Sequence, residues 1–418
     1  MAIRKGPLAG LRVVELAHVM AGPVGGLLLA DMGADVIKVE KLPGGDDTRR
    51  TIPPEIQGES ASFMIINRNK RGIAVNMKQS DGLALVRRLI SNSDVVLENF
   101  RPGTMEKMGL SFEALAAENP GLVYCKITGF GTNGPYAQRA GYDLIAQGMS
   151  GLMGLTGEGP GRPPVKVGVP VGDVTAGLLA ATGILAGYID RLKTGAGQYV
   201  DTSLLEASVL HTYWPAALAF ATGISAGPMG SAHPVAAPYQ AFPTADGWIN
   251  IGAIGQSNWE RIPGVLGLPG LLTDERFASN GGRMAHRDEL VAAMSAVLTQ
   301  RPTEDWVTAF ERAGVPAGPV KTMTQVLDDP QVLARDMVIT VEHPVAGQVQ
   351  ALGCPVKFSH GDGVSSRGAP LFGEHTEEVM RELGYAQSDI DRLARERVVH
   401  VHTAASRPQQ ADTVAMPV

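Results

Sequence analysis

The chain has 418 residues, of which 44% are hydrophobic, 19% charged and 5% aromatic, and its formal net charge is −6. A chain of this length is too long for one simple core, so two domains are expected. The acidic balance argues against a nucleic-acid-binding protein, which needs a basic face. Two cysteines without C-x-x-C spacing exclude a disulfide framework and a zinc site.

Several features predict a cytoplasmic protein with no membrane association. The paucity of cysteine is typical of a reducing compartment. The N-terminal apolar stretch is interrupted by Glu15, His18 and Asp31, which is unlike a signal peptide. The longest apolar run, residues 177–188, is shorter than the roughly 20 residues that cross a bilayer.

The first segments predict a βαβ unit. Residues 11–16 and 34–40 are rich in apolar and β-branched side chains, which is typical of strands. Residues 22–33 between them predict a helix that ends at a glycine. A strand, a helix and a strand in this order build a parallel sheet.

The alternation of strands and helices continues to about residue 200. Further strands are predicted at residues 73–77, 94–99 and 122–128, and residues 80–91 predict an amphipathic helix. We therefore expect an α/β fold, with residues 1–200 forming a large, doubly wound domain of Rossmann type.

The pattern changes in the second half. A helix is predicted at residues 203–222, strands at 239–242 and 248–253, and helices at 259–266, 286–298 and 303–313. These predict a smaller α+β domain over residues 226–325, with linkers at 201–225 and 326–349. Residues 350–402, with a helix at 374–383, are expected to complete the large domain, and residues 403–418 to form a flexible tail.

Asp173 is the most informative residue. The β-branched stretch from residue 166 predicts a strand before it, and residues 176–189 predict a buried helix after it. Asp173 would then lie in the turn, beside Gly172, where a large ligand can approach the backbone. A carboxylate there can act as a nucleophile. It can also be only a helix N-cap, which is the commoner role of such an Asp.

Familiar catalytic and nucleotide-binding motifs are absent. Residues 21–26 lack G-x-G-x-x-G spacing, and Pro23 removes a phosphate-binding N–H, which argues against NAD. There is no P-loop, G-x-S-x-G or H-E-x-x-H sequence. Basic residues near predicted strand ends suit either a solvated surface or a phosphorylated adenine nucleotide. They are Lys38, Lys41, Lys70, Arg71 and Lys78.

Several stretches together resemble the family III CoA-transferases, which include formyl-CoA transferase, carnitine CoA-transferase and α-methylacyl-CoA racemase. The resemblance extends from residue 7 to residue 380. Its specific stretches are Asp31-Met-Gly-Ala-Asp-Val-Ile-Lys-Val-Glu40, Asn69-Lys-Arg-Gly-Ile73, Glu98-Asn-Phe-Arg-Pro-Gly103, Ile127-Thr-Gly-Phe-Gly131, Gly141-Tyr-Asp143 and Val171-Gly-Asp173.

The resemblance implies that Asp173 is a nucleophile that carries CoA as an aspartyl thioester, in ping-pong kinetics. Coenzyme A or acyl-CoA is then a substrate, with no tightly bound cofactor and no metal. It also implies an intertwined, ring-like homodimer. Oxyanions formed on the way need N–H donors, and the start of the helix after Asp173 is expected to supply some.

The resemblance also carries CoA contacts onto this chain, which lie at or after the ends of predicted strands, in a pair of residues at the nucleotide, or beside the thioester. They are His18, Val19, Met20, Ala21, Lys41, Val75, Asn76, Met77, Lys78, Asn99, Phe100, Arg101, Lys107, Met108, Ala140, Tyr142 and Asp143. His233, in the small domain, is expected to help shape the acyl pocket.

Departures from the family pattern narrow the activity. Met20 stands where formyl-CoA transferases have Gln, and residues 230–234 replace a polyglycine flap, so oxalate and formate are doubtful substrates. Tyr142 stands where the racemases have His. A phenol with an ordinary pKa near 10 is a poor exchange base at neutral pH.

The sequence therefore favours a transferase that moves CoA from an acyl-CoA, such as succinyl-CoA, to another organic acid. A racemase or epimerase of acyl-CoA is the alternative within the family. A nucleotide-binding protein without catalysis, with Asp173 as a helix cap, is the third hypothesis.

Overall fold

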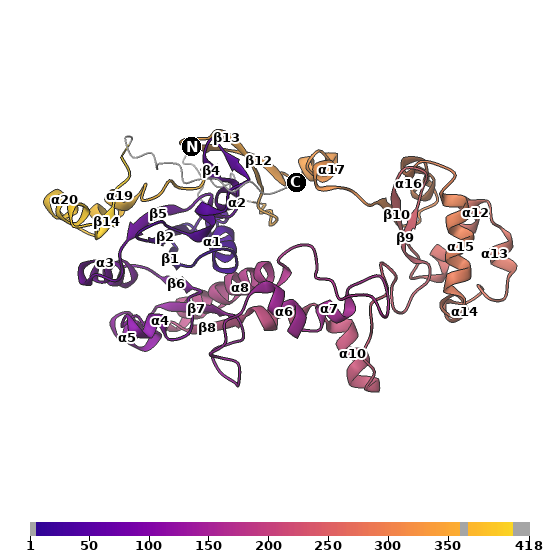
Figure 1. Ribbon diagram of the computed structural model, residues 1–418, viewed down its shortest axis with the longest axis horizontal. Helices are drawn as coiled ribbons and strands as arrows, with labels where there is room; N and C mark the ends of the chain where they lie inside the picture. The colour runs from indigo at the N-terminus through magenta and orange to yellow at the C-terminus, as the bar shows by residue number, and fades with distance from the viewer. Residues whose placement is uncertain (1–5, 360–366, 404–418) are drawn as a thin grey trace. The chain divides into compact units, whose positions relative to one another are not determined.

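The computed structural model describes residues 6–359 and 367–403, which divide into two compact units (Figure 1). Unit 1 contains the chain up to Leu152, Lys166–Ala216 and the chain from Leu333 onward. Unit 2 contains Met153–Val165 and Ala217–Val332. The predicted tail beyond Thr403 lies outside the described residues.

Unit 1 is built on a seven-stranded sheet of order β14-β5-β2-β1-β6-β7-β8. Its strands are β1 (Arg12–Leu16), β2 (Asp35–Lys41), β5 (Arg71–Val75), β6 (Val95–Glu98), β7 (Val123–Thr128), β8 (Tyr199–Ser203) and β14 (Val399–His400). Every pairing is parallel except that of β14 with β5. The strand order reverses between β1 and β6, where α/β sheets usually bind ligands.

Helices cover both faces of this sheet and confirm the predicted doubly wound α/β architecture. One face carries α3 (Ser80–Ser91), α5 (Phe112–Glu118), α19 (Thr376–Glu382) and α20 (Gln387–Arg395). The other carries α1 (Ala21–Asp31), α8 (Val171–Thr194) and α9 (Leu204–Leu210). Because side chains alternate along a strand, Val14 belongs to the first core and Val13 to the second.

Helix α8 packs closely on α1. A β-carbon at Gly177 would lie 2.6 Å from the carbonyl oxygen of Ala21 and 2.9 Å from a methyl of Val24, so the contact requires glycine. By length and composition alone α8 is apolar enough to cross a membrane. Its residues Ala180 and Ile184 are nevertheless buried in the second core of unit 1, as in the core helix of a globular domain.

Shorter elements complete unit 1. They are η1 (Asp47–Arg50), β3 (Glu55–Ile56), β4 (Glu59–Ser60), α2 (Ala61–Asn67), α4 (Thr104–Lys107), α6 (Asp143–Met149) and the hairpin of β12 (Val338–His343) with β13 (Gly347–Leu352). Three further helices contain or adjoin the points where the chain passes between the units. They are α7 (Leu152–Leu155), α10 (Tyr213–Thr222) and α18 (Pro330–Ala334).

Unit 2 packs helices against a three-stranded antiparallel sheet of order β11-β10-β9. The strands are β9 (Tyr239–Pro243), β10 (Trp248–Gly252) and β11 (Ala317–Pro319). The helices are α11 (Gln256–Trp259), α12 (Ile262–Leu266), α13 (Gly270–Thr273), α14 (Asn280–Ala285), α15 (Arg287–Leu298), α16 (Thr303–Arg312) and α17 (Met323–Leu327). Phe242, Ile249, Trp259, Leu290 and Phe310 are among the side chains of its core.

Two predicted elements are wrong. Residues 166–170 form no strand, because the backbone N–H of Val167 donates to the side chain of Gln147 and not to a neighbouring strand. Helix α8 therefore begins at Val171, and Asp173 lies in its first turn. The predicted helix at 203–222 is two helices, since His211 and Thr212 form tighter turn hydrogen bonds and Pro215 opens the next helix.

Candidate active site

The predicted CoA-binding residues of β1 and β6 meet at the switch point of the sheet. The backbone N–H of His18 donates to Asn99 Oδ1 at 2.9 Å, and Asn99 Nδ2 donates to the carbonyl oxygen of His18 at 2.9 Å. The rings of His18 and Phe100 lie 5.3 Å apart between centroids. The structure thus brings together residues that are 81 positions apart in the sequence.

Val19, next to His18, has a left-handed backbone with φ of 66°. A β-branched residue there is strained and needs support from its surroundings. Two contacts supply it: Asp46 Oδ1 accepts the Val19 N–H at 3.2 Å, and Asn99 holds the backbone of His18 on the other side. The side chain of Val19 is 48% exposed, so the strained turn presents it to solvent.

Four buried charges lie beneath this turn. Lys38 Nζ lies 2.9 Å from Glu15 and 2.9 Å from Asp46, and Lys70 Nζ lies 2.8 Å from Glu15. Burial would raise the pKa of Asp46, but Lys38 and hydrogen bonds from Thr48 hold this pKa well below its usual range. Burial lowers the pKa of Lys70 to about 8. Two positive and two negative charges balance, and removing any one would leave a net charge buried in the protein.

This network corrects one interpretation of the sequence. Lys38 and Lys70 have no exposed side-chain surface, so they support the turn from below and do not face a phosphate. Arg71 is held by Asp35 and by Glu382 of α19. Strand-end lysines that point into the protein cannot be told from exposed ones by sequence pattern alone.

Exposed cations do occur at the same edge of the sheet. Lys78 follows β5, Arg101 follows β6, and Lys107 ends α4; all three are exposed. Lys41 ends β2 and pairs with Asp47 at 2.7 Å. The carboxyl ends of parallel strands lie at one edge of the sheet, so these positive charges lie where they can bind the phosphates of a nucleotide.

Burial and the nearby Lys38 lower the pKa of His18, which keeps its imidazole neutral at pH 7.

Other predicted contacts follow the same strands. Ala21 is buried at the start of α1, and Val75 is buried at the end of β5. Asn76, Met77 and Met108 are partly buried.

Asp173 lies in the first turn of α8 but does not cap the helix. The cap comes from α6: Asp143 Oδ1 accepts the N–H of Gly172 at 2.8 Å and that of Asp173 at 3.3 Å. Among residues 6–359 and 367–403, none forms a hydrogen bond or an ion pair with the carboxylate of Asp173. Burial and the charge of Asp143 raise the pKa of Asp173 to about 7. The helix-cap interpretation of Asp173 is therefore wrong.

Gln147 holds Asp143 in place. Its Nε2 donates to Asp143 Oδ2 at 2.6 Å, and its Oε1 accepts the N–H of Val167 at 2.8 Å. Gln147 is fully buried, and it lies one helical turn after Asp143. Sequence reasoning missed Gln147, although the i, i+4 spacing of Asp143 and Gln147 was a signal for a pair on one helix face.

The neighbours of Asp143 in the sequence are exposed. Tyr142 is 72% exposed, and Ala140 is exposed as well. Gly172 is needed where α8 contacts α6 and α9, because a β-carbon there would lie 2.6 Å from Ser208 Oγ of α9 and 3.0 Å from Asp143 Oδ1 of α6. The motif Val171-Gly-Asp173 is thus a close helix contact followed by an unpaired carboxylate.

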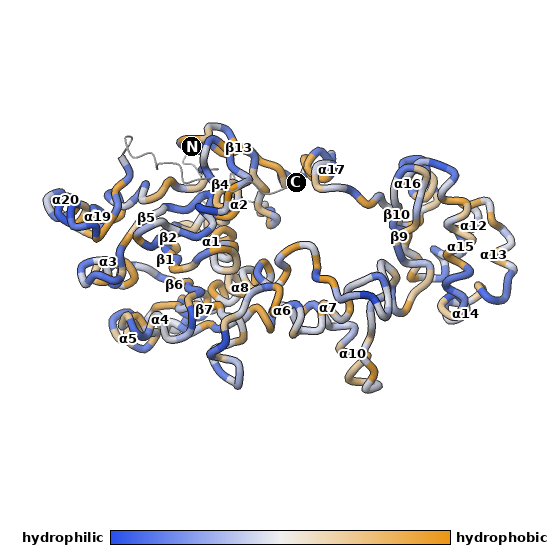
Figure 2. Tube along the Cα trace, in the orientation of Figure 1, coloured by the Kyte–Doolittle hydropathy of each residue, from blue (hydrophilic) through white to orange (hydrophobic). Residues whose placement is uncertain are grey.

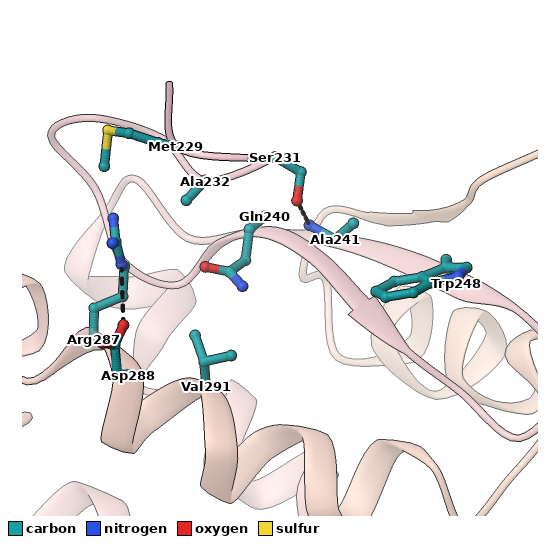
Figure 3. A pocket seen from close by; sticks show the side chains of 10 residues that line it. Met229, Ser231, Ala232, Gln240, Ala241, Trp248, Arg287, Asp288 and Val291 are labelled. Atoms are coloured by element: carbon teal, nitrogen blue, oxygen red, sulfur yellow. Dashed lines mark hydrogen bonds and ion pairs between the residues drawn. The ribbon is translucent and has the colours of Figure 1, made fainter. Parts of the chain in front are cut away.

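Unit 2 contains two cavities beside its sheet. The smaller, of about 300 Å³, lies between the 229–232 loop, the sheet and α15 (Figure 3). There the hydroxyl of Ser231 accepts the N–H of Ala241 at 3.0 Å, and Arg287 lies 3.8 Å from Asp288. The larger, of about 670 Å³, is lined by Tyr239 among others. The predicted residue His233 contacts Tyr239, with ring centroids 4.9 Å apart.

Comparison with known proteins identifies the class. The profile of CoA-transferase family III matches residues 8–376. The chain is 42% identical to the succinate–glutarate CoA-transferase of Agrobacterium fabrum, over 92% of this chain and 97% of that protein. It is 39% identical to the human succinyl-CoA:glutarate CoA-transferase, over 95% and 90% respectively. A crystal structure of a CaiB/BaiF family protein from Brucella suis, 42% identical, has a TM-score of 0.83 over 91% of this chain and 100% of that one.

The chain therefore belongs to CoA-transferase family III, as the sequence motifs predicted. It is an enzyme, a CoA-transferase that moves CoA between carboxylic acids.

Proposed function

We propose that the enzyme transfers CoA from an acyl-CoA to a free carboxylic acid through a thioester on Asp173, with ping-pong kinetics. The main support for this proposal is the state of the Asp173 carboxylate. It is partly buried, it has no partner within the described residues, and its pKa is raised to about 7. A carboxylate that lacks hydrogen-bond donors and is poorly solvated is a stronger nucleophile than one on the surface. The exposed cations at the strand ends would hold the phosphates of CoA.

The chemistry consists of two matched halves. Asp173 attacks the acyl carbonyl, the C–S bond breaks, and CoA leaves as a thiolate, so that the acyl group and Asp173 form a mixed anhydride. The thiolate attacks the aspartyl carbonyl, which releases the first acid and forms the aspartyl-CoA thioester. The acceptor carboxylate attacks this thioester, and the released thiolate attacks the acceptor carbonyl, which gives the new acyl-CoA and restores Asp173. The energy of the thioester is kept throughout, so no outside energy source is needed.

The start of α8 does not supply the oxyanion donors that the sequence suggested. The N–H groups of Gly172 and Asp173 are taken by Asp143, and that of Val174 is taken by the helix itself. Donors for the anionic intermediates must therefore come from elsewhere in the assembled site.

The proposed substrates are succinyl-CoA as donor and a dicarboxylic acid of similar length as acceptor. The names of two relatives support this, since both describe exchange between succinate and glutarate. His233 is proposed to shape the acyl pocket. The other predicted contacts are proposed to bind CoA at the carboxyl edge of the sheet. They are His18, Val19, Met20, Ala21, Lys41, Val75, Asn76, Met77, Lys78, Asn99, Phe100, Arg101, Lys107, Met108, Ala140, Tyr142 and Asp143.

We also propose a homodimer. Helix α10 has no buried residue, and Trp214 and Phe220 are 77% and 91% exposed. Several of its residues have the orange colour of the apolar end of the scale in Figure 2. A second copy of the chain would cover this surface.

The cytoplasm is the proposed location, because Cys125 and Cys354 are both free thiols.

Replacement of the nucleophile tests the proposal. Asp173→Asn, in folded protein, is expected to lower succinyl-CoA:glutarate transfer by at least about 10³-fold, as for loss of a covalent catalyst. Asp190→Asn, near the other end of α8, is the matched control and should retain activity. Wild-type transfer activity in Asp173→Asn would contradict the mechanism. Exchange of solvent deuterium at the α-carbon of an acyl-CoA without transfer would favour racemase chemistry instead.

A further inference from the structure

Helix α8 has an N-terminus whose cap comes from a different helix. Asp143, at the start of α6, reaches across 29 residues of sequence to accept the N–H groups of Gly172 and Asp173. Helix caps usually come from the residue directly before the helix. Here that residue is Pro170, whose side chain offers no acceptor. The first turn therefore depends on α6 for its hydrogen bonds.

We propose that Asp143 is a positioning residue for the nucleophile: its carboxylate holds the first turn of α8 and places a second negative charge beside Asp173. The proposal rests on the proposed function, in which Asp173 attacks the acyl-CoA. Asp143 acts in two ways. It consumes the N–H donors that would otherwise stabilise the Asp173 anion, and it places a second negative charge beside that anion.

The position of Asp143 is strongly determined. Its Oδ1 accepts two backbone N–H groups, and its Oδ2 accepts the amide of Gln147. Gln147 is anchored in turn by the backbone of Val167. These three donors stabilise the negative charge of Asp143. Gly172 allows the approach, because any β-carbon there would press on Asp143 and on Ser208.

Charged groups on the other elements packed against α8 have partners of their own. Glu206 of α9 bonds Ser203, and His211 after α9 bonds Thr175. Asp31 of α1 pairs with Arg68, Lys126 of β7 with Glu98, and Asp201 of β8 bonds Thr132. Asp143 is the only charge found to act on the pKa of Asp173 among the described residues.

Two substitutions separate the charge from the cap. Asp143→Asn keeps an oxygen for the two backbone N–H groups and removes the charge. Asp143→Ala removes both. Asp190→Asn is the control, because it removes an acidic group from the far end of the same helix.

The first measurement is carboxyl ¹³C NMR of aspartate-labelled, full-length enzyme, with the Asp173 resonance assigned by Asp173→Asn. The titration midpoint of Asp173 is expected near 7 in the wild type, and at least one unit lower in both Asp143 variants. It should be unchanged in Asp190→Asn. A midpoint that stays in place in Asp143→Asn overturns the proposal. This readout needs no turnover, so it decides the matter even if Asp173 is not a nucleophile or if Asp143→Ala does not fold.

The second measurement is the pH profile of transfer from succinyl-CoA to glutarate. The acid limb of kcat/KM, which reports the free enzyme, should move to lower pH in Asp143→Asn by the same amount as the NMR midpoint. In Asp143→Ala the plateau of kcat should fall at least tenfold below that of Asp143→Asn, with KM for succinyl-CoA within about threefold. Equal plateaus would overturn the positioning role. A wild type that lacks transfer, yet shows the expected NMR shifts, would refute the proposed function and leave the pairing of the two carboxylates intact.

Discussion

Asp173 combines two properties that a surface aspartate does not have, partial burial and an ionised neighbour. Both raise its pKa, to about 7. In the unfolded chain the same group has an ordinary pKa near 4. Between these values the native state binds more protons than the unfolded state, so the contribution of Asp173 to the free energy of unfolding falls as pH rises from about 4 to 7.

Because the ionised carboxylate of Asp173 lowers the free energy of unfolding, replacing it is predicted to stabilise the protein. Asp173→Asn should raise the free energy of unfolding at pH 8 by on the order of 1–2 kcal/mol, because the uncharged amide removes the repulsion from Asp143. The gain should be smaller at pH 5, where Asp173 is already protonated. Urea unfolding at the two pH values measures it. A variant that is less stable than the wild type at pH 8 would contradict the electrostatic account.

The sequence singled out Asp173, but it did not reveal the surroundings of this residue. The motif Val171-Gly-Asp173 marked it as the proposed nucleophile. The cap lies 30 residues earlier, and no local pattern connects the two positions. In the same way Lys38 and Lys70 were expected on a solvated surface or beside a nucleotide, since strand-end lysines face solvent in most proteins. Their burial follows from Glu15 and Asp46, whose proximity only the folded sheet creates.

At the scale of elements, the contact of α1 with α8 sets the place of Asp173, the proposed nucleophile. Gly177 lies one helical turn after Asp173, and its missing side chain lets α8 approach the backbone of Ala21 and Gly25. The same α1 follows the strained turn at Val19. One helix contact therefore links the turn at Val19, which is proposed to bind CoA, and Asp173, the proposed nucleophile.

Gly177→Ala tests this link. The added carbon would meet backbone atoms at 2.6 and 3.0 Å, so the helices must separate. We expect a loss of about 1–3 kcal/mol in the free energy of unfolding and a fall in transferase kcat. Gly264→Ala, in α12, is the matched control, because a β-carbon there has open space. It should be neutral or slightly stabilising, since alanine is the better helix former. Equal stability of the two variants would contradict the requirement for close packing.

The runs rich in apolar and β-branched residues predicted strands well, and residues 11–16 and 34–40 correspond to β1 and β2. Such a run failed at residues 166–170. The β-branched valines there suggested a strand, but Gln147 takes the Val167 N–H. The short strands β8 and β14 went unpredicted because each depends on a distant partner, β7 and β5.

At the scale of the whole molecule, the exposed apolar surface of α10 carries the proposal of a dimer. We expect the wild type to have twice the chain mass of 44.0 kDa in solution, measured by light scattering after size-exclusion chromatography. The double variant Trp214→Glu, Phe220→Glu should shift the protein to the monomer mass, because two charges would have to be buried at the interface. Leu272→Glu, on exposed α13 of unit 2, is the control and should leave the mass unchanged. A wild type of 44.0 kDa would contradict the proposal.

The most direct test of the account is to trap the intermediate on the nucleophile. The enzyme is incubated with succinyl-CoA and without acceptor, treated with hydroxylamine, digested, and mapped by mass spectrometry. A hydroxamate at Asp173, present in Asp190→Asn and missing from protein that was given free CoA, is the predicted result. Active enzyme that transfers CoA while Asp173 stays unmodified would contradict the aspartyl-thioester mechanism.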